Sequence, residues 1–297
     1  MKKTHVIIGS SAAGMSALNK IRQLDPHAEL ICITAQAELP YNKCLLADHL
    51  AGLKTEQQIL TATAESLQQK NIHLLRNTLV TNIEPTAKRV TLSDGQIITY
   101  DSLFLGLGTS AFVPPIAGAA LPGVFTFHTL ADAQNILAWI ALKRPRTAVV
   151  IGAGLSGLEA ADALANQGVA VTVVERGSQL LANQVDARGS ALIERCMQAR
   201  GVAWYPQQTV AEIMGIDSVA TVILENGKQL PADMVIVAAG ARTNSALALQ
   251  AGLALQQGGV IVDDQLMTSA QDIYAGGDLV VVRSQLTGEL VPSCTCL

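Results

Sequence analysis

The stretch TAVVIGAGLSGLEAADALANQGVAVTVVE (residues 147–175) determines the predicted fold of this chain. An apolar run ends in a complete G-x-G-x-x-G motif formed by Gly152, Gly154 and Gly157, and a helical pattern and a second apolar run follow. Glycines at this spacing allow a tight turn, close approach of a pyrophosphate, and close packing of helix on strand. The helix N-terminus favours the negative charge of the phosphates. The stretch therefore predicts a βαβ unit that binds a dinucleotide.

Glu175 ends the second apolar run of this unit. A carboxylate at that place can accept hydrogen bonds from a ribose 2'-hydroxyl, and it repels a 2'-phosphate. The sequence thus favours NADH over NADPH, although the adjacent Arg176 could pair with a phosphate and leaves NADPH as the alternative. The alternative to a nucleotide site is that the glycine loop is an ordinary tight turn and that Glu175 is a solvated acid at the end of a strand.

The same pattern occurs earlier in the chain. A strand is expected at 5–8, a helix at 14–24 and a strand at 29–33, around a loop in which Ser11 replaces the middle glycine. A small residue there still lets a pyrophosphate approach. The ribose-binding acid is missing after this unit, and Gln36 or Glu38 are the candidate substitutes. Four loop residues are expected to contact the cofactor: Gly9, Ser11, Ala13 and Gly14.

Periodicity also sets the expected domain organisation. Short β-type runs within 71–99 and 209–230 are each interpreted as an antiparallel meander, and an apolar strand follows each of them. The prolines at 114–115 indicate a linker, and the chain after Gly240 does not fit a third βαβ unit. We therefore predict an α/β fold with two nested Rossmann-like three-layer nucleotide-binding domains. The expected boundaries are 1–112 and 240–297 for one domain and 113–239 for the inserted one.

Composition excludes several classes of protein. With 297 residues, 49% hydrophobic and 15% charged, the chain is expected to be globular with two domains. Its net charge of -4 includes no basic block, so neither nucleic acid nor a membrane surface is an expected partner. Five unevenly spaced cysteines argue against a disulfide framework, and no metal site is expected. No apolar stretch approaches the roughly 18 residues of a membrane span, so a cytoplasmic location is expected.

Three further segments carry a specific resemblance. They are LGLGTS at 105–110, AGARTN at 239–244, and TS at 268–269 followed by IYAGGD at 273–278. With the two glycine loops, they resemble the motifs of the FAD-dependent pyridine nucleotide-disulfide oxidoreductase superfamily. The resemblance implies FAD in the outer domain, NAD in the inserted domain, and hydride transfer from NADH to FAD and then to an acceptor. It also implies four further cofactor-binding residues: Gly108, Thr109, Gly240 and Asp278.

The segment LPYNKCLL at 39–46 leaves two acceptor classes open. It is similar to the P-Y-x-R segment of ferredoxin, rubredoxin and nitrite reductase flavoproteins, which implies a redox protein or partner subunit as acceptor. In the same register, Cys44 falls where thiol-dependent members carry a redox cysteine, which implies a disulfide, peroxide or oxygen reductase. Glu159 resembles an acid beside the nicotinamide, with Lys43 as its candidate partner near the flavin. The plain alternatives are a small packing cysteine, a surface acid and an exposed lysine.

Members of this superfamily continue past the Gly-Asp motif with a helix over the flavin and an interface domain. This sequence stops at Leu297, so we expect the interface domain to be missing, which leaves the oligomeric state open. A catalytically weak nucleotide-binding remnant is a further alternative. No chemistry is assigned to Cys294 and Cys296 in the tail, because two ligands rarely hold a metal.

Overall fold

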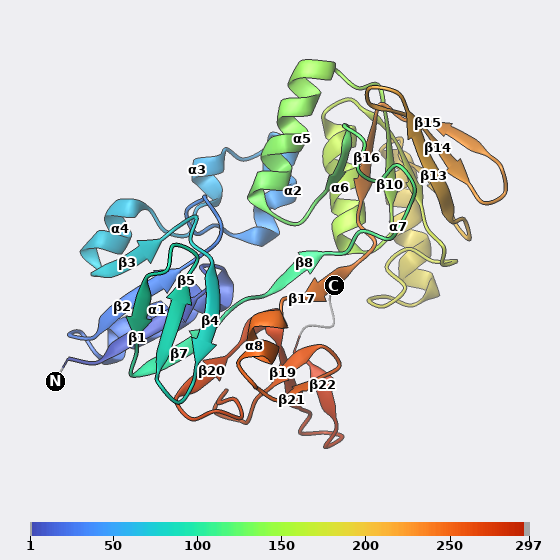
Figure 1. Cartoon of the computed structure of the whole chain (residues 1–297). Coiled ribbons are helices and arrows are strands. Elements are labelled where there is room, and N and C mark those ends of the chain that lie inside the picture. The colour runs from blue at the N-terminus through green and yellow to red at the C-terminus, as the bar shows by residue number, and fades with distance from the viewer. Residues whose placement is uncertain (1, 294–297) are drawn as a thin grey trace. The chain divides into compact units, whose positions relative to one another are not determined.

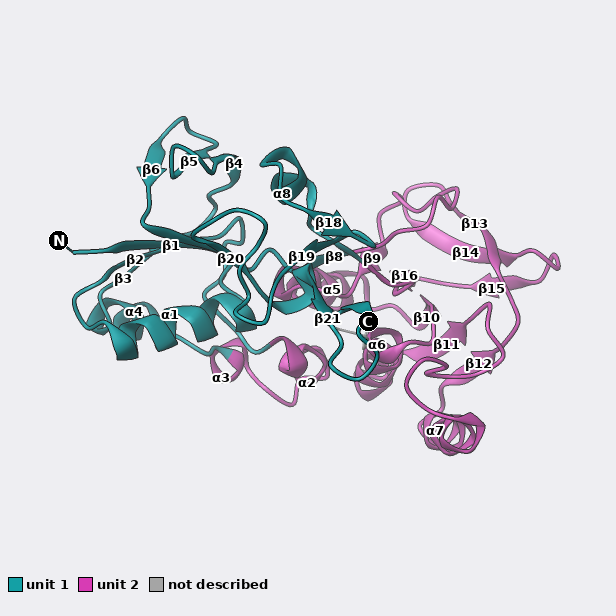
Figure 2. Ribbon diagram, turned by 90° about the horizontal axis from the view of Figure 1, so that it is seen from below, with its two compact units in different colours: residues 1–42, 60–110, 242–295 teal, residues 43–59, 111–241, 296–297 magenta. Residues whose placement is uncertain are grey.

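The computed structural model describes residues 2–293 and divides into two compact units (Figure 2). Among the described residues, unit 1 comprises 2–42, 60–110 and 242–293, and unit 2 comprises 43–59 and 111–241. The chain leaves unit 1 in β8 (Thr109–Ala111) and returns to it in β17 (Ala241–Thr243) (Figure 1). Cys294 and Cys296 lie outside the described residues.

Unit 1 is built on a five-stranded parallel sheet in the order β20-β7-β1-β2-β3. Its strands are β1 (Thr4–Ile8), β2 (Glu29–Ile33), β3 (Ile72–Leu75), β7 (Ser102–Leu105) and β20 (Ile273–Ala275). Helices α1 (Ala12–Leu24) and α4 (Ala64–Gln69) cover one face, and β4 (Val80–Glu84), β5 (Arg89–Leu92) and β6 (Ile97–Thr99) lie over the other (Figure 2).

Alternation along β1 explains these layers. Ile7 belongs to the core beneath α1, whereas Val6 and Ile8 belong to the core shared with the meander and the return segment. Successive side chains of a strand point to opposite faces, so a strand buried on both sides reads as a continuous apolar run. The predicted α/β architecture with Rossmann-like three-layer units is confirmed.

One expectation for unit 1 is wrong. Residues 71–75 were expected in the antiparallel meander, but β3 pairs with β2 in parallel. The physical reason is α4, which packs on β3 and forms the helical crossover that a parallel connection needs. The meander consists of β4, β5 and β6 only.

The return segment adds helix α8 (Ala246–Gln250) and a further, four-stranded sheet to unit 1. Its order is β18-β19-β21-β22, with strands at Leu255–Gln256, Gly259–Ile261, Val280–Arg283 and Leu290–Pro292. The short 3-10 helix η2 (Gly277–Leu279) connects β20 to β21 and carries Asp278.

Unit 2 repeats the plan with the parallel order β12-β11-β10-β16-β9. Its strands are β9 (Val124–Thr126), β10 (Thr147–Ile151), β11 (Ala170–Val174), β12 (Ala203–Tyr205) and β16 (Met234–Val237). Its long helices are α5 (Leu130–Lys143), α6 (Leu155–Asn166) and α7 (Ala187–Ala199). An antiparallel meander of β13 (Val210–Gly215), β14 (Val219–Leu224) and β15 (Gln229–Pro231) packs on the sheet through a shared apolar core.

Residues 43–59 lie with unit 2, although the sequence places them inside the first domain. They form a 3-10 helix, η1 (Lys43–Leu45), and two short helices, α2 (Leu46–Leu50) and α3 (Glu56–Ile59). Helix α2 packs on α5 and α6, and the side chain of Gln167 donates a hydrogen bond to the carbonyl of Leu50 at 2.9 Å. Burial of Leu46, Leu50 and Ile59 explains why this segment stays with the helices of unit 2.

Within residues 2–293, no helix has the length and apolar character needed to cross a membrane.

Candidate functional site

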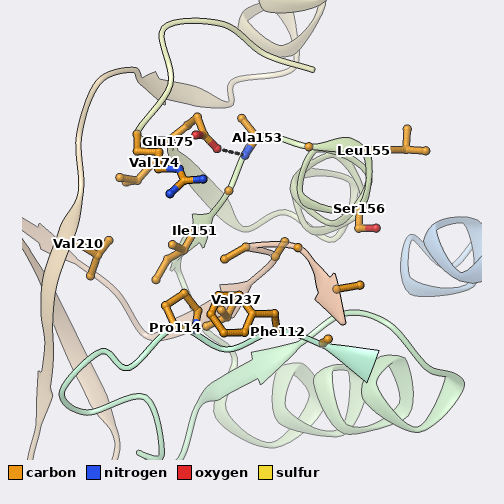
Figure 3. Close-up of a pocket in the computed structure, with 18 of the residues that line it drawn as sticks. Phe112, Pro114, Ile151, Ala153, Leu155, Ser156, Val174, Glu175, Val210 and Val237 are labelled. Atoms are coloured by element: carbon orange, nitrogen blue, oxygen red, sulfur yellow. Dashed lines mark hydrogen bonds between the residues drawn. The ribbon is translucent and has the colours of Figure 1, made fainter. Parts of the chain in front are cut away.

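A pocket lies at the carboxyl edge of the sheet in unit 2 (Figure 3). Its volume is about 510 Å³, and its lining comes from the ends of β9, β10, β11 and β16 and from the segment 111–116. Open parallel sheets bind their ligands at this edge, because loops and helix N-termini meet there. Apolar side chains such as Phe112, Pro114 and Val210 line much of it.

The three glycines of the 152–157 loop have distinct physical roles. Gly152 has φ +110°, and a Cβ on it would lie 2.3 Å from the carbonyl oxygen of Ala238. A Cβ on Gly157 would lie 2.1 Å from the carbonyl oxygen of Gly152. A Cβ on Gly154 would meet no atom within 4 Å. The outer glycines are thus required by packing, whereas the middle glycine leaves open space beside the N-terminus of α6, as close approach of a pyrophosphate requires.

Glu175 lies next to this loop (Figure 3). Its Oε2 accepts a hydrogen bond from the backbone N–H of Ala153 at 2.9 Å, and its Oε1 accepts one from that of Gly177 at 2.8 Å. These bonds fix the carboxylate at the pocket wall. An ionised carboxylate has about four lone-pair sites, so both oxygens retain capacity for ribose hydroxyls. Arg176 also lines the pocket.

The first glycine loop shows the same close packing in unit 1. A Cβ on Gly9 would lie 2.1 Å from the carbonyl oxygen of Gly106, and one on Gly14 would lie 1.9 Å from that of Gly9. Ser11 is the N-cap of α1 and is exposed. The structure brings the Gly-Asp turn beside this loop, because a Cβ on Gly277 would lie 3.0 Å from that of Ala13.

Asp278 is half-buried in that turn. It follows Gly277, which lies against Ala13 in the first turn of α1, so Asp278 is near the N-terminus of this helix. Gln36 follows β2, and its side-chain amide donates to the Tyr41 hydroxyl at 3.4 Å. The remaining predicted cofactor residues, Gly108, Thr109 and Gly240, lie in or next to β8 and β17. The carbonyl of Gly108 accepts a hydrogen bond from the backbone N–H of Asn244 at 3.0 Å.

Glu159 lies on α6 and is half-buried. Burial and the nearby carboxylate of Asp48 on α2 raise the pKa of Glu159 above its ordinary value. Lys43 and Cys44 lie in η1, where Cys44 is exposed.

Sequence reasoning missed His128. It is 9% exposed, it lines the pocket beyond the end of β9, and its ring nitrogens lie 3.0 and 3.2 Å from the Nζ of Lys43. The sequence signal was weak, because β9 is only three residues long and joins the sheet next to β16, far along the chain.

The chain matches the profile of the family described as Pyridine nucleotide-disulphide oxidoreductase over residues 3–294. It belongs to this family. Members are oxidoreductases that use FAD and NAD(P)H, which accounts for two dinucleotide loops in one chain.

Three similar proteins illustrate the match. The chain is 32% identical to an NADH oxidase from Methanocaldococcus jannaschii, over 96% of this chain and 64% of the relative. It is 32% identical to a nitrite reductase [NAD(P)H] from Bacillus subtilis strain 168, over 98% and 36%. The crystal structure of a covalent putidaredoxin reductase-putidaredoxin complex superposes with a TM-score of 0.91 at 29% identity, covering 98% of this chain and 70% of that chain.

The chain thus spans less than two thirds of the length of both of these curated relatives.

Proposed function

We propose that this protein takes hydride from NADH onto FAD and passes the electrons to a redox protein or a partner subunit. The observation that supports this proposal most directly is the pocket of unit 2. There, the open space at Gly154 and the hydrogen-bonded carboxylate of Glu175 lie at the same edge of the sheet. Bound FAD supplies the redox chemistry, and the protein supplies binding, orientation and electrostatics.

On the nucleotide side, the proposed roles follow from position. The backbone around Gly152, Gly154 and Gly157 and the N-terminus of α6 hold the pyrophosphate. Glu175 accepts hydrogen bonds from the ribose hydroxyls. A 2'-phosphate would meet that carboxylate and be repelled, so NADH is the preferred donor, while Arg176 weakens the preference.

On the flavin side, the fit rests on the close packing in unit 1. Gly9 and Gly14 admit no side chain, so the loop backbone lies tight against the sheet and the N-terminus of α1 is available to a second pyrophosphate. Asp278, in the turn beside Ala13, is the proposed acceptor for hydroxyl groups of the flavin chain.

The proposed acceptor is supported by the similar proteins. One is a reductase in complex with the redox protein putidaredoxin, and another is a nitrite reductase. A second candidate function is thiol-dependent or oxygen reduction, which the exposure of Cys44 and the likeness to an NADH oxidase favour.

Separating the two half-reactions tests the proposal. In an anaerobic stopped-flow experiment, NADH should bleach the flavin absorbance of the purified protein. The reduced protein should then be mixed with a small iron-sulfur or rubredoxin-type protein, a disulfide, or oxygen. Fastest reoxidation by the redox protein supports the first candidate, and fastest reoxidation by the disulfide or oxygen supports the second.

A further inference from the structure

Gln208 lies beside Glu175 in the pocket wall of unit 2. In the parallel sheet, β12 is next to β11 on the side away from β10, and the connection from β12 to β13 carries Gln208. The backbone N–H of Gln208 donates to the carbonyl of Glu175 at 3.0 Å, and that of Gln207 donates to the carbonyl of Gly177 at 2.9 Å. With the pyrophosphate at the loop after β10 and the ribose at Glu175, as in the proposed function, the adenine lies toward Gln208.

Apolar side chains at this end of the pocket suit the faces of a purine. Val174 precedes Glu175, Val210 follows the turn that carries Gln208, and both line the pocket (Figure 3). Both valines also belong to the buried core of unit 2, so packing fixes their positions. Such walls do not distinguish one purine from another, so the choice of base depends on the polar side chains that meet its edge.

A chain of hydrogen bonds fixes the orientation of the Gln208 amide. The backbone N–H of Lys228 donates to Oδ1 of Asn226 at 2.9 Å. Because a backbone N–H only donates, the atom that it meets must be the oxygen of Asn226, and the other end of that amide must be the amino group. Nδ2 of Asn226 donates in turn to Oε1 of Gln208 at 2.7 Å. Reversal of the Gln208 amide would set two amino groups against each other.

The other amides of the pocket wall lack this constraint. Gln179, Asn183 and Gln184 line the pocket, but their side chains make no hydrogen bond within residues 2–293, so their amide groups can rotate. In Gln208, Oε1 retains one lone pair and Nε2 retains both N–H groups. A ligand at Gln208 therefore meets an acceptor and a donor in one fixed order.

We propose that Gln208, with its amide oriented by Asn226, makes this site select adenine dinucleotides over dinucleotides that carry a 6-oxopurine. The amino group of adenine donates and the adjoining ring nitrogen accepts, which matches Oε1 and Nε2 of Gln208. Hypoxanthine has a carbonyl oxygen in place of that amino group, so two acceptors would face each other. Gln208 contacts the base in this account, and Asn226 is a positioning residue. The inference rests on the proposed nucleotide site in unit 2.

Calorimetric titration of the purified protein tests this without turnover. The two probes are NAD⁺ and nicotinamide hypoxanthine dinucleotide, which carry the same charge and differ only in the purine. The wild-type protein should bind NAD⁺ at least about tenfold more tightly, as expected for one amide that makes two hydrogen bonds to a base. Gln208→Leu removes both bonds and should abolish most of this preference.

Asn226→Asp separates orientation of the amide from packing. One carboxylate oxygen still accepts from the backbone N–H of Lys228, and the other can only accept, so it draws Nε2 of Gln208 toward it and reverses that amide. The preference for NAD⁺ should fall at least about tenfold, to equality or below. The matched control is Gln207→Glu, which adds the same charge beside Gln208 but retains Asn226, and it should leave the preference unchanged. If Gln208→Leu does not fold, Asn226→Asp decides the question.

Equal affinity of the wild-type protein for the two probes, or a preference for NAD⁺ that Asn226→Asp leaves unchanged, would overturn the inference and leave the proposed function standing. Binding of neither probe would overturn both.

Discussion

At the scale of single residues, we expect Glu175 to determine the preference for NADH over NADPH. Two backbone N–H groups fix its carboxylate at the pocket wall. Hydrogen bonds to a charged group contribute about 1.5–3 kcal/mol, so Glu175→Ala should lower kcat/KM for NADH roughly ten- to a hundredfold. NADPH should lose far less, because the variant also removes a repulsive charge. Steady-state kinetics with both nucleotides measure this change.

Arg176→Ala is the control for that prediction. It removes the neighbouring cation and should therefore increase the preference for NADH, which we expect to be roughly ten- to a hundredfold in the wild-type protein. Equal efficiency of NADH and NADPH in the wild-type protein would mean that Arg176 outweighs Glu175.

The raised pKa of Glu159 predicts that the stability of the protein depends on pH. Burial and Asp48 raise its pKa, so between the unfolded and folded pKa values the folded state holds more protons on this carboxyl than the unfolded state. The free energy of unfolding therefore falls as the pH rises through that window. Glu159→Gln removes this loss. Its thermal midpoint relative to wild type should be higher at pH 7 than at pH 4.

Asp48→Asn serves as the companion variant. It removes the second cause of the raised pKa of Glu159. The difference between its thermal midpoints relative to wild type at pH 7 and pH 4 should have the same sign but be smaller, because burial is the larger cause. A Glu159→Gln effect that is the same at both pH values would contradict the account.

Cys44 separates the two acceptor classes. If it relays electrons, Cys44→Ser should leave flavin reduction by NADH intact and abolish turnover with a disulfide. If electrons pass directly to a redox protein, the substitution should cost less than about tenfold. We expect the second result, and rapid mixing of each half-reaction measures it.

At the scale of elements, the glycine loop predicts opposite behaviour for two similar substitutions. Gly154→Ala adds a methyl group into open space at an N-cap, so it should cost less than about 1 kcal/mol of stability. It should nevertheless weaken NADH binding, because the methyl group occupies the approach of the pyrophosphate. Gly157→Ala places the same group 2.1 Å from a backbone oxygen and should destabilise by about 1–3 kcal/mol.

Thermal unfolding and nucleotide titration of both variants check this contrast. Normal NADH affinity in a fully stable Gly154→Ala protein would show that the pyrophosphate lies elsewhere.

Elements with strong local signals were predicted from the sequence. The strands at Glu29–Ile33, Thr147–Ile151 and Ala170–Val174 have the expected bounds, because each is mostly apolar and is followed by a glycine or a polar residue. The assignment of residues 71–75 to the meander failed, because a short strand does not reveal its partner. Helix α7 was also missed; most of its residues are exposed, and only Ser190 and Met197 are buried.

At the scale of the whole molecule, the internal repeat of the βαβ unit could be predicted from the sequence. The unit to which residues 43–59 belong could not. Both glycine loops occupy the predicted strand-to-helix turns. Residues 43–59 lie with unit 2 through contacts to α5 and α6, more than 70 residues away in sequence, and no local pattern encodes such contacts. His128 escaped for the same reason, since only the fold brings it to Lys43.

Anaerobic reduction of the purified protein by NADH tests the central claim most directly. Two dinucleotide loops predict that FAD copurifies, identified by acid release and chromatography, and that its flavin absorbance bleaches on adding NADH. Gly154→Ala should keep the FAD and bleach more slowly. A protein that carries only FMN, or bound FAD that NADH fails to reduce, would contradict the account.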